Sequence, residues 1–435
     1  MAFVHNMSCE CTKSELDLFT IPPTQTGIEH GQWVEYRPLS TLSDGAPIEF
    51  GISGSGEDYM DLANTHLHIE GKIVQVDGAN IAAAAAVGPV NLLLHSLFSQ
   101  VDVSLNEKLI TPSTNTYPYR AYLETLLSYG PAAKDTQLSS SLWYEDTAGH
   151  MDDVADNNVG LNTRKAFTAL STTVELMGRL HCDFFFQDRY LLNGVDLKIR
   201  LVRSKDAFAL MAGGANPSFK FSITQASLFV RKVHLSSTAQ LGHIRALENG
   251  TAKYPVRRVE TKVFAIPRGN RMTNQENVFL GQLPKRIVIG CVGNDAFNGS
   301  YAKNPYHFQH FDINFLALYV DGHQIPAKPL QPDFARGRYM RAYTSLFAGT
   351  GQLYQDEGNN ITREEYAQGY TLFAFDLTPD LNEGDHFNVV KQGNLRLEIH
   401  FGAALADTIN VVVYAEFENV IEIDRSRNII FDYTA

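Results

Sequence analysis

Cysteine is scarce in this sequence, which excludes a covalent framework as the source of its stability. Four cysteines occur in 435 residues, whereas secreted domains that depend on disulfides are dense in them. Cys9 and Cys11 form an isolated Cys-x-Cys with no second pair nearby. We therefore interpret them as two reduced thiols in an N-terminal arm, and we expect no metal there.

Long apolar runs and targeting signals are also missing. The longest apolar stretch, residues 81–98, contains Pro89, Asn91 and His95 and falls short of the ~20 apolar residues of a membrane span. The N-terminus has no basic segment followed by an apolar one, so we expect no secretory signal peptide. These features predict a chain that is not secreted and has no membrane span.

Positive charge is in deficit. Asp and Glu number 48 and Lys and Arg 36, a net charge of −12, whereas a chain that mainly grips nucleic-acid phosphate needs the opposite balance. Residues 251–287 are the exception, because eight basic and two acidic residues give 8 − 2 = +6. This basic segment either faces nucleic acid or an acidic neighbouring subunit, or forms a solvated strand edge where Lys and Arg discourage aggregation.

Most signatures of enzymes are missing too. The sequence has no Gly-x-Ser-x-Gly, no His-Glu-x-x-His and no Gly-x-x-x-x-Gly-Lys motif. His66-x-His68-x-Glu70 does place three possible metal ligands on one face of a strand. A cupin, however, has its Glu further along the chain and a Gly upstream. We therefore favour a polar, solvent-facing strand surface over a metal site.

Two His-x-Asp pairs are a second possible metal motif. His181-x-Asp183 and His310-x-Asp312 both fit the first half of the ligand set of jelly-roll iron oxygenases. A distant histidine such as His234 would have to complete either set, and nothing in the sequence marks it. We therefore predict no catalytic residue, no metal site and no cofactor, and a metal-dependent jelly-roll enzyme remains the alternative.

Strand signals dominate from residue 32 onward. Two hairpins are expected, with turns at Asn106-Glu107 and at Asp321-Gly322. Helical periodicity is confined to residues 119–129, 236–250 and 338–349. The other segments predicted as strands by alternation are residues 65–76, 195–202, 219–233, 394–401 and 408–423.

Residues 1–30 differ from the rest and are predicted to be an N-terminal arm. They show no sustained period, and Pro22 and Pro23 favour an extended backbone without ladder hydrogen bonds. The arm carries one apolar patch, which suggests docking onto another surface during assembly. The patch consists of Leu16, Leu18, Phe19 and Ile21.

The second half of the chain repeats the order of the first. The tripeptide Arg-Ala-Tyr begins at Arg120 and again at Arg341, an offset of 341 − 120 = 221, which pairs Tyr122 with Tyr343. Further along, residues 193–202 match residues 392–401, and the matched glycines differ by 393 − 194 = 199.

The first copy is therefore longer between these anchors by 221 − 199 = 22 residues. We expect the surplus to form a long exposed loop over residues 130–167, which are rich in Gly, Ser, Asp and Asn. Each copy then needs two antiparallel sheets packed face to face.

The predicted fold class is all-β, with two tandem jelly-roll sandwiches and a few short helices. We expect residues 1–30 to be the arm, residues 31–245 the first jelly roll with its 130–167 loop, and residues 252–435 the second jelly roll.

Several segments resemble the double jelly-roll major capsid proteins of the Polinton/Maverick and adintovirus kind, and virophage capsid proteins more distantly. The resemblance runs from about residue 14 to about residue 425. Its motifs are SELDLFTIPPTQTGIE, YRAYLETLLSYG, WYEDTAGHMD, DRYLLNGVDLKIRL and LPKRIVIGCVGNDAFNGSYAKNPYHF.

The resemblance implies a structural, self-assembling protein without catalysis or cofactor. Such chains are similar in forming hexon-like, pseudo-hexameric homotrimers that tile an icosahedral capsid around a double-stranded DNA genome. The expected partners are other copies of the chain, a single jelly-roll vertex protein and, only weakly, packaged DNA. The expected location is the virion, after synthesis in the host cytoplasm or nucleus. The alternative is a metal-dependent enzyme or glycan-binding protein that uses His66 and His68 or a His-x-Asp pair.

Overall fold

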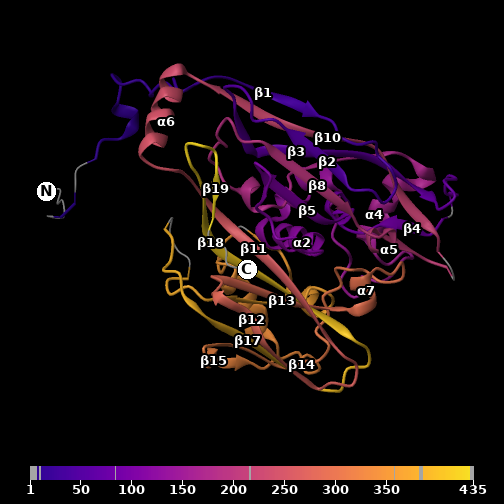
Figure 1. Ribbon diagram of the computed structural model, residues 1–435. Helices are drawn as coiled ribbons and strands as arrows, with labels where there is room; N and C mark the ends of the chain where they lie inside the picture. Colours follow the sequence, from indigo (N-terminus) through magenta and orange to yellow (C-terminus); the bar gives the residue numbers. More distant parts are fainter. Residues whose placement is uncertain are drawn as a thin grey trace.

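Four antiparallel sheets, paired into two sandwiches, form the body of the protein (Figure 1). The computed structural model describes residues 7–8, 11–83, 85–214, 217–356, 358–381 and 386–431. Cys9 of the predicted Cys-x-Cys lies outside these residues, and Cys11 is an exposed free thiol. In Figure 1 the first half of the chain, indigo to magenta, lies above the second half, orange to yellow.

The first sandwich consists of two four-stranded sheets. One sheet has the order β1 (Ile28–Tyr36), β10 (Phe219–Leu235), β3 (Tyr59–Gln75), β7 (Val174–Gly178). The other has the order β2 (Ile48–Ile52), β8 (Leu197–Arg203), β5 (Phe98–Leu105), β6 (Lys108–Leu109). A separate pair joins β4 (Val87–Pro89) to β9 (Leu210–Ala212).

The second sandwich is built in the same way. Its first sheet has the order β11 (Ala252–Ile266), β18 (Ile409–Ile423), β13 (Arg286–Gly293), β16 (Leu372–Asp376), and β19 (Ile429–Ile430) pairs with β18. Its second sheet has the order β12 (Met272–Gln282), β17 (Gln392–Phe401), β14 (Ile313–Val320), β15 (His323–Leu330).

Both sandwiches share one topology. If the eight sandwich strands of each half are counted along the chain, leaving out β4, β9 and β19, the sheets have the orders 1-8-3-6 and 2-7-4-5 in both. This is the arrangement of an eight-stranded jelly roll. The predicted fold class, two tandem jelly rolls with a few short helices, is therefore confirmed.

Local sequence signals account for much of this pattern. Asn106 and Glu107 both have positive φ between β5 and β6, as do Asp321 and Gly322 between β14 and β15. Positive φ at both central residues matches the right-handed twist of a two-residue hairpin. Both predicted hairpins are therefore confirmed.

The three predicted helices are also present. They are α2 (Tyr117–Ser128), α6 (Ser237–Asn249) and α8 (Met340–Gly349). Ser236 caps α6 by accepting a hydrogen bond from the backbone N–H of Ala239. The other helices are η1 (Ser14–Leu16), α1 (Leu93–Ser96), α3 (Pro131–Lys134), η2 (Gln137–Ser141), α4 (Val159–Thr168), η3 (Ala169–Ser171), η4 (Asp183–Phe186), α5 (Asp206–Ala209), α7 (Asn294–Asn298) and α9 (Arg363–Ala367).

The two hydrophobic cores draw on both halves of the chain. Tyr122 of α2 is buried in the same core as Tyr306 and Phe308 of the second half. Conversely, Tyr254 and Ile421 of the second half are buried in the core of the first. The two jelly rolls are thus packed against each other through side chains as well as joined by α6.

The prediction of a long exposed loop over residues 130–167 is wrong. The segment instead forms α3, η2 and α4, and Trp143, Met151 and Leu161 are buried in the second core. Its polar residues serve internal structure, since Asn158 caps α4 by accepting from the backbone N–H of Leu161. The extra residues therefore fill the space between the halves.

Candidate functional site

A buried ionic cluster lies where the two jelly rolls meet. The guanidinium of Arg120 contacts Glu124 at 3.0 Å, one helical turn along α2, and Asp183 of η4 at 2.7 Å. All three side chains are buried. His181 hydrogen-bonds the other carboxylate oxygen of Glu124 at 2.6 Å. The predicted repeat residue Arg120 is therefore the centre of a charge network.

The electrostatics of this cluster depend on pairing. Burial opposes ionisation of Glu124, but Arg120 and His181 outweigh it and hold the pKa of Glu124 below its ordinary value. Burial raises the pKa of Asp183 despite Arg120. A buried charge left without its partner is strongly destabilising, so the cluster stabilises the fold only while it is complete.

The same cluster reaches into the second half. The Tyr414 hydroxyl donates to Glu416 at 2.9 Å and lies 3.4 Å from Glu124. Asp183 accepts from the backbone N–H of Val259 at 3.2 Å. These contacts join α2 and η4 of the first half to β11 and β18 of the second.

A second buried pair strengthens the junction. Arg164 of α4 is fully buried and contacts Asp146 at 2.6 Å. The other Asp146 oxygen accepts from the Asn304 side chain at 2.9 Å. The Tyr370 hydroxyl donates to the backbone carbonyl of Asp146 at 2.6 Å. Asn304 and Tyr370 belong to the second half, so the segment expected to be an outer loop connects the two jelly rolls.

Five of the eight cations in the basic segment 251–287 pair with carboxylates of the same chain. Carboxylates of β18 pair with its cations, since Glu416 lies 3.5 Å from Arg257 and 3.6 Å from Arg286. Lys253 also pairs with Glu422 at 2.9 Å. Neither reading of the sequence anticipated this, because the acidic partners come more than a hundred residues later.

The predicted histidine cluster is completed by a residue that the sequence did not indicate. Glu70 of β3 lies directly opposite Glu175 of β7, and the His68 ring is 2.8 Å from Glu175 and 4.0 Å from Glu70. These three groups can together offer a nitrogen and two oxygens to a divalent ion. His66 is not part of the group, and burial together with Arg179 lowers its pKa.

The two His-x-Asp pairs are engaged elsewhere. His181 and Asp183 belong to the buried ionic cluster. His310 stacks on Phe334 at 4.2 Å and accepts from the backbone N–H of Asp312 at 2.9 Å. In the described part of the chain, neither pair belongs to a group of three His, Cys, Asp or Glu side chains that all lie close enough together to hold one ion.

The arm patch is exposed in the single chain. Pro22 and Pro23, which follow it, are exposed as well. β1 begins only at Ile28. In Figure 1 the arm runs away from the body beside α6. The exposed fractions of the patch residues are 66% for Leu16, 76% for Leu18, 95% for Phe19 and 87% for Ile21.

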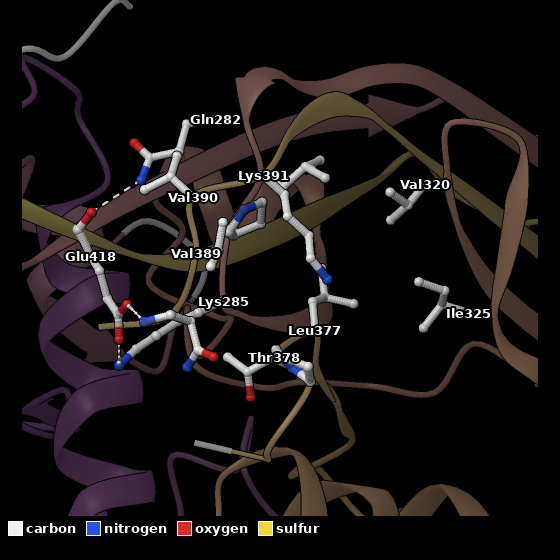
Figure 2. A pocket seen from close by; sticks show the side chains of 14 residues that line it. Gln282, Lys285, Val320, Ile325, Leu377, Thr378, Val389, Val390, Lys391 and Glu418 are labelled. Atoms are coloured by element: carbon white, nitrogen blue, oxygen red, sulfur yellow. Dashed lines mark hydrogen bonds and ion pairs between the residues drawn. The ribbon is translucent and has the colours of Figure 1, made fainter. Parts of the chain in front are cut away.

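A second exposed apolar surface lies on the second jelly roll, in the segment between β16 and β17. Val389 and Val390 border a small hollow of about 90 Å³ (Figure 2). Glu418 anchors the segment by accepting from the backbone N–H of Asn388 at 2.8 Å, and it contacts Lys285 at 3.4 Å. Val389 nevertheless remains 85% exposed.

The repeated helix positions have different surroundings. α2 and α8 both lie between the fifth and sixth sandwich strands of their halves, β6 and β7 or β15 and β16. Tyr122 is buried and stacks on Tyr306 at 4.0 Å. Arg341 is exposed and donates to the backbone carbonyl of Pro329 at 2.7 Å. Tyr343 is partly buried and donates to the backbone carbonyl of Ile361 at 2.9 Å.

The sequence is similar to one curated protein along nearly its whole length. An uncharacterized protein of Caenorhabditis elegans is 25% identical over 427 residues, which cover 95% of this chain and 99% of that protein. No family model matches the chain. None of the helices in the described ranges is long and apolar enough to cross a bilayer.

The fold is shared with solved capsid structures. A chain of the Sputnik virophage matches with a TM-score of 0.68 at 12% identity, covering 98% of this chain and 93% of that one. The Faustovirus major capsid protein matches at 0.59 and 9% identity, with coverages of 93% and 92%. The mavirus major capsid protein matches at 0.57 and 11% identity, with coverages of 99% and 97%. All three matches extend over both jelly rolls.

Proposed function

We propose that this chain is a major capsid protein that assembles an icosahedral shell. The observation that carries the proposal is the double jelly roll itself, matched over nearly the full length of structures described as major capsid proteins. Buried ion pairs hold the two jelly rolls in a fixed arrangement. A shell subunit needs such a fixed shape to make the same contacts with each neighbour. The role is structural, without catalysis.

The assembly unit that we propose is a homotrimer. Three copies of two similar lobes give six lobes around one axis, and closed cyclic symmetry then forms a pseudo-hexameric tile. Residues 31–245 and 252–435 are the proposed lobes, with Arg120 and Tyr122 at positions equivalent to Arg341 and Tyr343. The arm patch then serves contacts between copies.

Within the major capsid proteins, we propose that this chain belongs to the Polinton/Maverick and adintovirus group, because of the sequence motifs quoted above. A double-stranded DNA genome, a single jelly-roll vertex protein as partner and residence in the virion belong to the same proposal. Synthesis in the host cytoplasm or nucleus belongs to it as well. Because five of the eight cations of residues 251–287 pair with carboxylates of the same chain, we expect contact with packaged DNA to be weak.

Native mass spectrometry of the purified full chain tests the assembly unit. We expect a trimer at micromolar concentration, with an interface above about 2,000 Å² in total. A spectrum of monomers alone would contradict the proposal.

One observation favours a second candidate, a metal-dependent enzyme or glycan-binding protein. The group of His68, Glu70 and Glu175 has ligand types that suit a divalent ion. Elemental analysis of the purified protein separates the two candidates, because only the second requires one metal per chain.

A further inference from the structure

A groove lies beneath α6, the helix that links the two jelly rolls. Its volume is about 580 Å³, which is within the ~300–1,000 Å³ of pockets that hold compact ligands. The lining is mainly apolar and comes from α6, from the ends of β1, β10 and β11, and from the segment before β8. Its main apolar residues are Ile28, Leu192, Leu235, Ala246, Leu247 and Tyr254.

The helix above this groove is lightly packed. Among the residues of α6, only Leu247 is buried. His243 ties the helix to the body through a 3.0 Å hydrogen bond with the Tyr59 hydroxyl. On its other faces α6 exposes Leu241 by 55% and Ile244 by 50%. Apolar side chains inserted beneath α6 would therefore add packing that one chain lacks.

The arm enters the body beside the same groove. Gly27 lines the groove, and its carbonyl accepts from the backbone N–H of Ser236 at 2.9 Å. The arm patch, residues 16–21, lies just before it in the chain, and Phe19 is 95% exposed. In a single chain, none of the residues of the arm patch lines the groove, although Gly27, six residues after Ile21, does so.

The charges of the two surfaces are complementary in sign. The arm carries Glu15 and Asp17 beside its apolar residues, with Lys13 as its nearby basic residue. The groove is bordered by Arg189 and Lys253, with Asp188 as its acidic residue. Lys253 also pairs with Glu422 at 2.9 Å, and Arg189 donates to the backbone carbonyl of Lys253 at 2.5 Å. Arg189 is exposed at the rim, where an acidic segment can reach it.

We propose that the arm patch of one copy docks into the groove beneath α6 of a second copy. This inference rests on the proposed self-assembly and names its contact. A second copy is favoured because Pro22 and Pro23 hold the segment after the patch extended. Entry into the chain's own groove would need a reversal within residues 22–26. Docking in trans also gives each copy one donor and one acceptor, which is the condition for a repeating lattice.

Disulfide trapping between full-length chains tests this contact. Both partners carry Cys9→Ser and Cys11→Ser, and the remaining Cys182 and Cys291 are buried. One preparation then carries Phe19→Cys and the other Ala246→Cys, and the two are mixed under assembly conditions and oxidised. We expect covalent dimers of chains, since a disulfide forms only when the two Cα atoms come within about 7 Å.

The matched control places the second cysteine on the same helix but outside the groove lining. With Leu241→Cys in place of Ala246→Cys, we expect at least ten-fold less cross-linked dimer. Leu16→Asp with Leu18→Asp, added to the Phe19→Cys chain, is expected to lower the yield similarly. These two changes lie on the exposed arm, so they test the docking without risk to the folded body.

Three outcomes separate this inference from the proposed function. Trimers or shells with equal cross-linking at Leu241→Cys and Ala246→Cys would overturn the docking and leave the capsid role intact. Cross-linking only within single chains that carry both Phe19→Cys and Ala246→Cys would overturn the second-copy claim. Specific covalent dimers without any trimer or shell would support the docking and remove the capsid role.

Discussion

At the scale of single residues, Arg120 explains why the two halves behave as one unit. Its guanidinium contacts Glu124 and Asp183, and these carboxylates in turn meet Tyr414 and the backbone of Val259 from the second half. The arginine therefore neutralises two buried charges at the surface between the jelly rolls.

Replacing Arg120 is predicted to destabilise the fold strongly. Arg120→Met should lower the free energy of unfolding by about 3–5 kcal/mol, because it leaves two buried carboxylates without their cation. Urea denaturation followed by circular dichroism measures the change. Arg341→Met is the matched control, since Arg341 is exposed and a surface change should cost within about 0.5 kcal/mol. Equal effects of both changes would contradict this account of the junction.

Acid is predicted to loosen the same junction. The pKa values of Glu124 and Glu416 are held below the ordinary 4.5 by neighbouring arginines, which outweigh burial. Their contribution to stability is therefore complete above pH 4.5 and is lost as the pH falls below it. Asp183 contributes to the pH dependence of stability with the opposite sign, because burial raises its pKa. Its protonation in acid therefore offsets part of the stability lost at Glu124 and Glu416.

The measurement is the unfolding midpoint between pH 7 and pH 3. We expect a steep fall below about pH 4.5, and a shallower one in Glu124→Gln, which no longer titrates at that position. A variant whose slope matches the parent would show that Glu124 does not couple acid to stability.

Metal is predicted to be dispensable. Elemental analysis of the purified chain should find no stoichiometric zinc, iron or manganese. His66→Ala with His68→Ala should leave assembly intact, because both histidines alternate along β3 with the core residues Leu67 and Ile69 and so point away from the core. One metal per chain, lost in this variant, would instead support the enzyme candidate.

At the scale of helices and strands, the sequence could predict what depends on near neighbours. The alternation of apolar and polar residues predicted strands, and the pair Asp321-Gly322 predicted a hairpin turn. Apolar residues at helical spacing predicted α2. The fold class of two jelly rolls also followed, because the repeat indicated two similar halves that each need two sheets.

What depends on distant pairing could not be read from the sequence. Residues 130–167 have the composition of a surface loop, yet Trp143 is buried in the second core and Arg164 in the junction. The same holds for Glu175, which joins His68 only because β7 pairs with β3. Contacts of these two kinds join residues that are far apart in the sequence, so no local sequence pattern indicates them.

The arm is predicted to act in assembly and not in folding. Deleting residues 1–26 should leave the unfolding midpoint unchanged, because the arm patch is exposed in the single chain. The trimer should persist, while shell formation should weaken. Thermal denaturation and native mass spectrometry measure the first two, and light scattering the third. An unfolded deletion variant would place the arm patch in the core.

At the scale of the whole molecule, the two jelly rolls pack into one unit with two unequal lobes. Both lobes have the same sheet orders, but the first carries the longer connection that fills the junction. Exposed apolar side chains include the arm patch and Val389, which lies before β17.

Electron microscopy of the expressed full-length chain tests the central claim most directly. We predict single particles with three-fold symmetry, six lobes and a pseudo-hexagonal outline, together with closed shells at higher concentration. Particles that show only the two lobes of one chain, at concentrations where native mass spectrometry also finds monomer, would contradict a capsid role.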